Sequence, residues 1–492
     1  MKEQTETNLA KNTLQDVVSY AKENGFIYPS SEIYEGLQAV YDYGHNGVEL
    51  KKNLQALWWK SMTQLNMNIV GIDAAIFMHP KTWQASGHVD SFSDPMIDNK
   101  DSKKRYRVDV LIEAYASKLK ELGKSKEAES LLESMNELLK LSSLDGLHKL
   151  ILSNKIPCPV SNTLNWTDVR NFNLMFSTQC GAIEESSNTV YLRPETAQGI
   201  FVNFANVQKN ARMKLPFGIA QIGKAFRNEI IARQFIFRMR EFEQMEMQFF
   251  VKPGTENHWF EHWKESRLKW HKSLGIPEDC LRIHVHEQLA HYAKNAVDIE
   301  YNFPFGFKEI EGIHSRTDFD LKNHQTYSNK KLSYFDADVN QTYIPYVIET
   351  SIGCDRTILM LLCNGLTTEK FEDAGETKTR TYLKILPALA PVKVAVFPLM
   401  KKDGLQIKAL SILDNLKLDF PVAYEENQSI GKRYARQDII GTPYCITVDY
   451  QTLENDTVTI RERNSMTQTR IHCNDLNKFI SDKTSLRSVF IT

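Results

Sequence analysis

The spacing of apolar side chains changes along the chain, and each change predicts a different kind of element. Residues 14–64 carry apolar positions at helical spacing, among them Leu50, Leu54 and Trp58, around a Gly-containing turn. We predict two helices here, with the apolar stripe packed against a core. Residues 112–155 are rich in Lys, Glu, Leu and Ser, which predicts a helical insertion with a solvated face.

The middle of the chain is patterned as strands. Two long runs, 216–230 and 236–251, are rich in apolar and β-branched or aromatic residues and are separated by a short polar connection. Two long neighbouring strands joined by a loop imply an antiparallel sheet. A further strand, 344–351, leads into an amphipathic helix at 354–363, with Gly353 at the junction.

The last quarter of the chain has a different character. After the Pro-rich stretch 387–391, strand-like runs alternate with helix-like segments at 405–416 and 431–440, which predicts a small α/β domain. The Pro-rich stretch is the best domain boundary. We therefore predict one domain at 1–386 and another at 387–492.

The alternation of side chains in the predicted strands points to a binding cleft. In the run 237–249 one face is apolar, and the other carries six residues: Arg238, Arg240, Phe242, Gln244, Glu246 and Gln248. In the preceding strand, Arg227 and Glu229 share a face with Gln221. A polar strand face is usually solvated, but an aromatic ring among arginines and carboxylates suits a nucleotide together with an amine.

Composition narrows the class of protein without identifying it. The chain has 492 residues, of which 42% are hydrophobic and 25% charged, and its formal net charge is -1, as in soluble globular proteins. This balance excludes a histone-like basic protein but allows a local RNA-binding patch. The seven cysteines include no Cys-x-x-Cys pair, so we expect neither a disulfide framework nor zinc. Without a leader-like or membrane-spanning apolar run, we expect a cytoplasmic protein with no membrane partner.

Phosphate cannot be held here by a P-loop or a Gly-x-Gly-x-x-Gly loop, because neither motif occurs. The segments FRNE, REFEQME and ETSIGCDRTILMLL instead resemble the second and third motifs of the class II aminoacyl-tRNA synthetases. Five further segments resemble the glycine-specific members in particular: RPETAQGIF, WQASGHVDSFSDPM, FNLMF, EIEGIHSRTDFDL and APVKVAVFPL. Two departures, at His45-Asn46 and at Thr350, remove no side chain that the chemistry needs.

The resemblance implies a fold and an activity. The expected fold class is α/β (α+β in the catalytic domain): a class II antiparallel sheet flanked by helices, the helical insertion, and a C-terminal α/β anticodon-binding domain. The expected activity is glycine–tRNA ligation, in which ATP activates glycine and the glycyl group passes to the 3′ end of tRNA(Gly). ATP with Mg²⁺ and tRNA(Gly) are the expected partners, and the expected form is the bacterial-type homodimer.

The resemblance also assigns site residues. Arg227 and Arg356 are expected to carry the catalysis by holding phosphate. The expected ATP-binding set is Arg227, Asn228, Glu229, Phe237, Arg238, Met239, Arg240, Glu241, Phe242, Glu309, Ile310, Gly353, Cys354, Asp355 and Arg356. Glu309 is also the candidate ligand for Mg²⁺, a hard cation that prefers oxygen.

For glycine, the expected set is Arg107, Glu195, Phe242, Glu243, Gln244, Met245, Glu246, Glu349, Thr350, Ser351, Ile352 and Gly353. Glu195, Glu246 and Glu349 would repel one another around an empty cavity, and an ammonium ligand would relieve that repulsion. For tRNA the candidates are Lys432, Arg433, Arg436, Arg461 and Arg463, although such charges are more often solvated.

Two alternatives stay open at the level of sequence. A class II synthetase for another small amino acid would share the motif residues and differ in its amine pocket. A non-catalytic, synthetase-like tRNA-binding protein would be expected to have lost Arg227 or Arg356, and the chain retains both.

Overall fold

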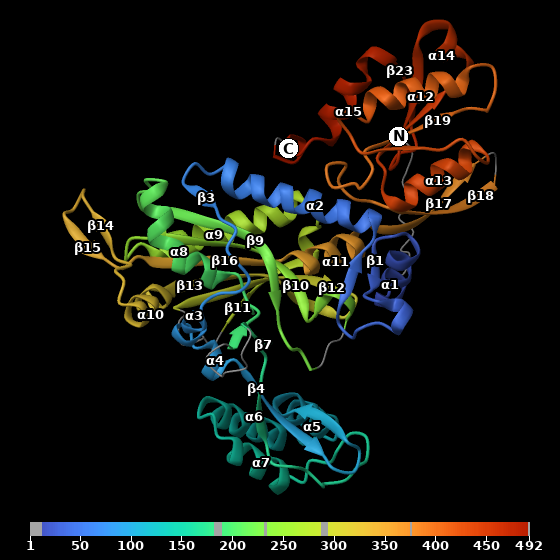
Figure 1. Ribbon diagram of the computed structural model, residues 1–492. Coiled ribbons are helices and arrows are strands. Elements are labelled where there is room, and N and C mark those ends of the chain that lie inside the picture. The colour runs from blue at the N-terminus through green and yellow to red at the C-terminus, as the bar shows by residue number, and fades with distance from the viewer. Residues whose placement is uncertain (1–11, 182–188, 231–233, 287–293, 374–375, 491–492) are drawn as a thin grey trace. The chain divides into compact units, whose positions relative to one another are not determined.

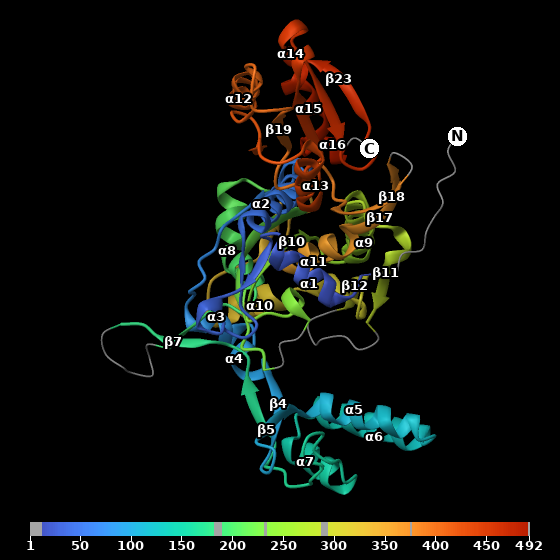
Figure 2. The same ribbon diagram turned by 90° about the vertical axis from the view of Figure 1, so that its right-hand side faces the viewer.

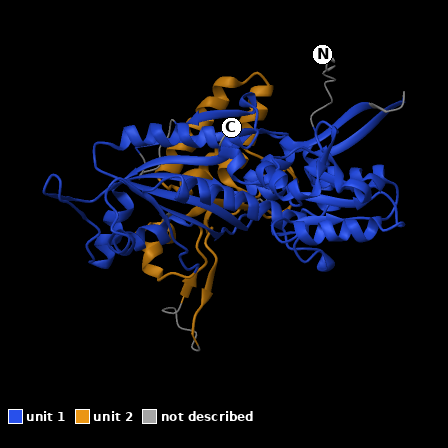
Figure 3. Cartoon of the chain, turned by 90° about the horizontal axis from the view of Figure 1, so that it is seen from above, with its two compact units in different colours: residues 1–76, 195–492 blue, residues 77–194 orange. Residues whose placement is uncertain are grey.

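The computed structural model describes residues 12–181, 189–230, 234–286, 294–373 and 376–490. Residues 1–11, which entered the argument against a leader, lie outside this range. The chain forms two compact units, one made of 1–76 with 195–492 and the other of 77–194 (Figure 3). The boundary expected after residue 386 is not one of these divisions and stays a prediction.

The larger unit is built on a seven-stranded sheet in the order β11-β12-β13-β16-β10-β9-β3 (Figure 1). Every neighbouring pair is antiparallel except β3 with β9, so the class II type of antiparallel sheet is confirmed. Its strands are β3 (Ile69–Gly71), β9 (Phe217–Phe226), β10 (Glu241–Val251), β11 (Leu281–Val285), β12 (Asn295–Phe303), β13 (Gly306–Thr317) and β16 (Tyr346–Gly353).

Helices cover both faces of this sheet, because successive apolar residues such as Phe249 and Phe250 of β10 point to opposite faces. On one face, Met245, Met247 and Phe249 of β10 share a core with residues of α2, α9 and α11. On the other, Phe201 and Phe204 of α8 pack with Phe217, Phe250 and their neighbours. The helices of this unit before the C-terminal region are α1 (Leu14–Glu23), α2 (His45–Trp59), α8 (Ala197–Asn210), α9 (Glu256–Ser273), α10 (Phe319–Ser328) and α11 (Cys354–Gly365).

The N-terminal region differs in part from the two-helix prediction. Both helices are present, and α2 continues into a π turn, η2 (Lys60–Gln64). Between the helices, however, β1 (Ile27–Pro29) pairs with β2 (Tyr41–Tyr43) around a short 3-10 turn, η1 (Glu32–Tyr34).

Both long strands are shorter next to their connection than the sequence pattern predicts. β9 ends at Phe226 and β10 begins at Glu241, so the prediction that Arg227, Arg238 and Arg240 lie on strands is wrong. The physical reason is a turn with left-handed backbone at Gln234 and Phe235, followed by the 3-10 turn η4 (Phe235–Phe237). Apolar residues continue through this turn in the sequence, and Ile236 and Phe237 are buried.

The smaller unit combines helices with short strands. Its three-stranded sheet has the order β5-β4-β6, from β4 (Ser93–Asn99), β5 (Lys104–Arg107) and β6 (Arg170–Asn173). The region predicted as a helical insertion contains α5 (Val108–Glu121), α6 (Ser125–Lys140) and α7 (Leu144–Ser153), which share a core of their own. The remaining elements of this unit are α3 (Pro80–Ala85), α4 (His88–Ser91), β7 (Ser177–Gln179) and β8 (Thr189–Tyr191).

The C-terminal region forms the predicted α/β fold around a sheet of order β20-β19-β21-β22-β23 (Figure 2). Its first three strands in that order are parallel and the rest antiparallel. The strands are β19 (Val394–Pro398), β20 (Val422–Tyr424), β21 (Tyr444–Val448), β22 (Thr457–Glu462) and β23 (Gln468–His472). The helices are α12 (Leu405–Leu416), α13 (Ile430–Ile440), α14 (Tyr450–Asn455), α15 (Leu476–Thr484) and α16 (Arg487–Phe490), with a turn, η6 (Cys473–Asp475).

Two hairpins and one short turn complete the fold. The hairpins are β14 (Tyr334–Asp336) with β15 (Gln341–Tyr343), and β17 (Leu366–Asp373) with β18 (Glu376–Leu383). The turn is η5 (Glu278–Cys280). Among the described residues, no helix is both long enough and apolar enough to cross a membrane.

A buried ionic cluster joins α9 to the sheet. Arg267 Nε and His271 Nε2 of α9 lie 2.6 and 2.7 Å from the two oxygens of Glu311 on β13. All three side chains are buried. Burial alone would raise the pKa of Glu311, but the charge of Arg267 and the hydrogen bond from His271 hold it below its usual value.

We predict that Glu311→Gln lowers the free energy of unfolding by about 3–5 kcal/mol, because it leaves the Arg267 guanidinium buried without a counter-charge. Denaturant unfolding followed by tryptophan fluorescence measures this loss. Glu278→Gln is the matched control: Glu278 pairs with Lys272 of α9, but the Glu278 side chain is 83% exposed. The control should leave the unfolding midpoint unchanged, and equal effects of the two changes would contradict the prediction.

Candidate active site

A cavity of about 130 Å³ opens where β9, β10 and β16 reach the same edge of the central sheet. Residues from the two predicted motifs line it together. The lining residues are Arg227, Glu229, Ile236, Phe237, Arg238, Met239, Phe242, Glu243, Gln244, Glu309, Ser351, Gly353, Asp355 and Arg356.

Cross-strand register places the polar residues of three strands on one face. Gln244 of β10 lies opposite Gly223 of β9 and Gly353 of β16. One step further along, Glu246 lies opposite Gln221 and Ser351. Opposed residues in an antiparallel pair point to the same side of a sheet, so these steps form one continuous polar surface.

One side of the cavity combines guanidinium groups with an aromatic ring. Arg227 lies just beyond β9, where its backbone N–H still donates to Arg240, and its guanidinium carbon lies 5.3 Å from the centre of the Phe242 ring. Arg238 Nη1 lies 3.5 Å from Glu229 Oε2. Such a pairing of cation and ring can hold a base and a phosphate side by side.

Arg356 reaches the same cavity from the first turn of α11. Its Nη1 lies 2.9 Å from Glu309 Oε2, its Nε donates to the Phe237 carbonyl at 3.2 Å, and it lies over the Phe237 ring. Burial would raise the pKa of Glu309, but the charge of Arg356 lowers it, so Glu309 is a carboxylate at neutral pH.

A second network fixes the base of α11. Asp355 accepts hydrogen bonds from the Tyr43 hydroxyl and from the backbone N–H of Glu243, the latter at 2.7 Å. Glu243 in turn forms an ion pair with Lys51 of α2, with 2.7 Å between Nζ and Oε2. Burial raises the pKa of Asp355 to about 6 despite these hydrogen bonds. Glu243 is therefore committed to α2, although it also lines the cavity.

The expected amine pocket is a buried polar cluster next to Ser351. Gln248 Nε2 donates to both Glu246 and Glu349, at 2.6 and 2.7 Å, and so joins the two carboxylates. Glu246 also accepts from the Thr196 hydroxyl. Burial and the neighbouring charges of Glu349 and Glu195 raise the pKa of Glu246 well above its usual range.

Cations of the protein balance part of this negative charge. Arg316 donates to Glu349 at 3.1 Å and makes a two-pronged pair with Asp320, while His314 Nδ1 lies 2.9 Å from Glu349. Burial alone would raise the pKa of Glu349, but Arg316 and His314 hold it at about 2. The same contact raises the pKa of His314 against the effect of its burial. The carboxylates thus do not depend on a ligand alone for compensation.

Sequence reasoning missed the residues that support these carboxylates. His314, Arg316, Asp320, Thr196 and Gln248 were not assigned to the site. Alternation along EIEGIHSRTDFDL, which places His314 and Arg316 two residues apart, was the available signal. Their shared partner, Glu349, lies on a different strand, and that pairing follows only from the sheet order.

Several residues expected to contact ATP or glycine have side chains that point away from the cavity or do not line it. Met245, Ile310, Ile352 and Cys354 are buried in the apolar core and are not among the residues that line the cavity. Thr350 lies opposite Met247 on the same core-directed face. Three more expected residues, Asn228, Arg240 and Glu241, are not among those that line the cavity. Arg240 instead supports the neighbouring loop, since it donates to the carbonyls of Gln38 and Glu229.

Arg107 belongs to the smaller unit. Within that unit it pairs with Asp109 and Asp94. Glu195, which opens the second segment of the larger unit, accepts from Gln198 Nε2 at 2.9 Å. Its expected place in the amine pocket agrees with its effect on the pKa of Glu246.

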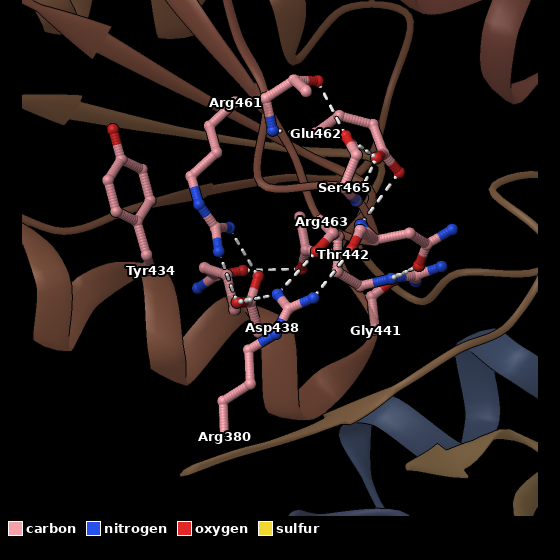
Figure 4. Close-up of polar contacts among 12 residues, drawn as sticks. Arg380, Tyr434, Asp438, Gly441, Thr442, Arg461, Glu462, Arg463 and Ser465 are labelled. Atoms are coloured by element: carbon pink, nitrogen blue, oxygen red, sulfur yellow. Dashed lines mark hydrogen bonds and ion pairs between the residues drawn. The ribbon is translucent and has the colours of Figure 1, made fainter. Parts of the chain in front are cut away.

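Three of the five candidate tRNA contacts are structural arginines instead. Arg433, Arg461 and Arg463 are 2%, 6% and 1% exposed. Arg461 pairs with Asp438, whereas the other two donate chiefly to backbone carbonyls (Figure 4 for Arg461 and Arg463). Their guanidinium groups are therefore engaged inside the protein, while Lys432 and Arg436 remain exposed on α13.

Comparison with protein families agrees with this arrangement. Residues 176–364 match the class II core domain of tRNA synthetases specific for G, H, P, S and T, and residues 393–483 match an anticodon-binding domain. Residues 94–129 and 121–174 match insertion domain 1 of glycyl-tRNA synthetases.

Individual relatives are similar over nearly their whole length. The glycine–tRNA ligase of Chlorobaculum tepidum is 52% identical over 472 residues, which cover 96% of this chain and 100% of the relative. The glycine–tRNA ligases of Macrococcus caseolyticus and Staphylococcus haemolyticus are 50% and 51% identical over 96% of the chain and 99% and 98% of theirs. The chain therefore belongs to the glycyl-tRNA synthetases, a family of class II aminoacyl-tRNA ligases.

Proposed function

We propose that the chain activates glycine with ATP and then transfers the glycyl group to the 3′ end of tRNA(Gly). The observation that carries this proposal is the cavity that Arg227, Phe242 and Arg356 line together with Ser351, which lies opposite Glu246 of β10. In the first step a glycine carboxylate oxygen attacks the α-phosphorus of ATP, and the bond to pyrophosphate breaks. No protein nucleophile is needed, so catalysis consists of positioning and of stabilising charge.

Each group near the nucleotide has a proposed role. Arg227 holds the α-phosphate, where charge develops, and the Phe242 ring stacks on adenine next to it. Glu229 accepts from the adenine amino group. Arg356 reaches the γ-phosphate, since its guanidinium is already aligned by the Phe237 carbonyl and Glu309. In the second step a terminal ribose hydroxyl of tRNA attacks the glycyl carbonyl and AMP leaves.

The glycine ammonium is proposed to lie against Glu246, Glu349 and Ser351, with Glu195 nearby. These residues are supported by buried donors and so are held in fixed positions. Arg107 is a further proposed contact from the smaller unit. In this proposal the side chains that bind the ammonium leave little space for a β-carbon.

Mg²⁺ is proposed to accompany ATP, with Glu309 as an oxygen ligand. The Glu309 carboxylate fits this role, because it is ionised, partly exposed and part of the cavity wall. Within the described segments no three His, Cys, Asp or Glu residues are grouped to hold a metal, so ATP itself would supply most of the ligands. When bound, the ion would neutralise phosphate charge.

The tRNA-binding and assembly features are also proposals. We assign 387–492 to anticodon binding and 1–386 to catalysis, with Lys432 and Arg436 as the exposed candidates for phosphate contact. Two further properties are inferred from the family resemblance, namely a bacterial-type homodimer and a cytoplasmic location.

We predict that Arg227→Ala lowers glycine-dependent ATP–pyrophosphate exchange by on the order of 10²- to 10³-fold, the usual effect of removing a preorganised donor to developing charge. The matched control is Arg282→Ala. Arg282 lies on the edge strand β11, is half-exposed and pairs with Glu300 of β12. This variant should exchange at the normal rate. Normal exchange by a folded Arg227→Ala protein would remove this residue from the mechanism.

Glycine affinity should depend on pH through Glu246. Burial and the charges of Glu349 and Glu195 raise its pKa and so favour the protonated form, whereas a glycine ammonium would favour the charged form. The KM for glycine should therefore fall as pH rises through this pKa and increase as pH drops below it. Glu246→Gln should raise the KM and flatten its pH dependence, measured by pyrophosphate exchange. An unchanged pH profile in the variant would contradict this role.

Selectivity gives a third prediction: activation of alanine or serine should be at least about 10²-fold weaker than that of glycine. A β-carbon would overfill the pocket at a cost of about 1–3 kcal/mol, and each ~1.4 kcal/mol changes the rate tenfold. Ser351→Gly, which empties space beside Gln244, should raise alanine activation relative to glycine. Pyrophosphate exchange with each amino acid measures both effects. Equal efficiencies for glycine and alanine in the unmutated enzyme would overturn the pocket assignment.

A further inference from the structure

The hairpin β17–β18 begins where α11 ends, and one of its side chains reaches the C-terminal region. Arg380 of β18 donates through Nη1 to the carbonyl of Arg463 and through Nη2 to that of Asn464, both at 2.7 Å. Its Nη1 also lies 3.3 Å from Asp438 Oδ2 of α13 (Figure 4). One guanidinium thus holds the end of a helix and the turn that follows β22.

Arg380 is oriented from its own hairpin before it makes these contacts. Glu369, its cross-strand partner on β17, accepts from Nε at 2.7 Å, and the Tyr382 ring lies 4.3 Å from the guanidinium carbon. The side chain is only 9% exposed. A planar guanidinium fixed on two sides presents its remaining donors in a defined direction, which a flexible lysine cannot do.

Asp438 does not need Arg380 in order to be satisfied. Arg461 donates to both of its oxygens at 2.8 Å, and both residues belong to the C-terminal region. Arg463 likewise donates to the Gly441 carbonyl at the end of α13, as well as to Ile385 at 2.7 Å. Loss of Arg380 would therefore leave the internal pairing of the C-terminal sheet in place and remove a link to the catalytic part.

The held helix is the one that carries the exposed cations. Arg380 contacts Asp438 in the last turn of α13, and Lys432 and Arg436 precede Asp438 on the same helix. Its carbonyl end is fixed a second time, because the Tyr20 hydroxyl of α1 donates to the Ile439 carbonyl at 2.6 Å. The direction of α13 is thus set by elements of the catalytic part.

We propose that Arg380 is a positioning residue for aminoacyl transfer: it fixes α13 to the hairpin behind α11, so that tRNA bound at the C-terminal region presents its 3′ end to the cavity. This inference rests on the proposed function. Arg380 touches neither substrate in the first step, and its removal should separate the two steps.

The experiment compares glycine-dependent pyrophosphate exchange with tRNA charging in the full-length chain. In Arg380→Met, exchange should stay within about twofold of normal, whereas kcat/KM for tRNA should fall by about tenfold or more. Arg380→Lys should recover little, since it keeps the charge but loses the fork. The matched control, Arg470→Met, removes a fork to Asp449 that lies entirely within the C-terminal region. It should charge tRNA normally.

The other possible outcomes would contradict either the positioning role or the proposed function. Normal charging by Arg380→Met, an equal loss of both activities, or an equal loss in Arg470→Met would overturn the positioning role. If circular dichroism shows that Arg380→Met does not fold, Glu369→Gln is tested instead, because it removes the carboxylate that orients Arg380. Normal tRNA charging by Glu369→Gln would then overturn the positioning role. Failure of the unmutated chain to exchange pyrophosphate with glycine would instead overturn the proposed function.

Discussion

The site depends on the register between β10 and its neighbours. Gln244, Glu246 and Gln248 point to one side of the sheet, and their partners on β16 include Gly353, Ser351 and Glu349. On the other side, Met245, Met247 and Phe249 fill the core. A slip of one residue would exchange the two sets, burying carboxylates among the methionines. The apolar side of β10 therefore fixes the position of its polar side, although Met245, Met247 and Phe249 do not line the cavity.

Charge is distributed unevenly across that face. The end at the cavity carries Arg227, Arg238 and Arg356, while the buried end carries the carboxyl groups of Glu246 and Glu349. At the buried end, Arg316 and His314 keep Glu349 ionised, and Glu246 carries the raised pKa. The pKa values of the two neighbouring carboxyl groups are thus shifted in opposite directions, because burial and like charges dominate at Glu246 whereas Arg316 and His314 contact Glu349 directly.

Much of the fold could be predicted from alternation, and much of the site from motif residues on single strands. The antiparallel sheet, the helix after Gly353 and the C-terminal α/β region follow from local periodicity. The sequence could not indicate where β10 begins, because apolar alternation continues through the turn at Gln234 and Phe235. Nor could it distinguish Arg433 or Arg463 from solvated arginines, because their partners are backbone carbonyls brought together only by folding.

The pairing of β13 with β16 is interrupted between Ser315 and Thr317, where two steps on β13 correspond to one on β16. Arg316 is the additional residue of this bulge, and it contacts Glu349 and Asp320. Deletion of Arg316 would restore regular pairing but would remove the cation that contacts Glu349 and Asp320. The length of this segment is thus as constrained as its composition. Among homologous enzymes, we expect insertions and deletions to be absent between His314 and Asp320, even where the identities of neighbouring residues vary.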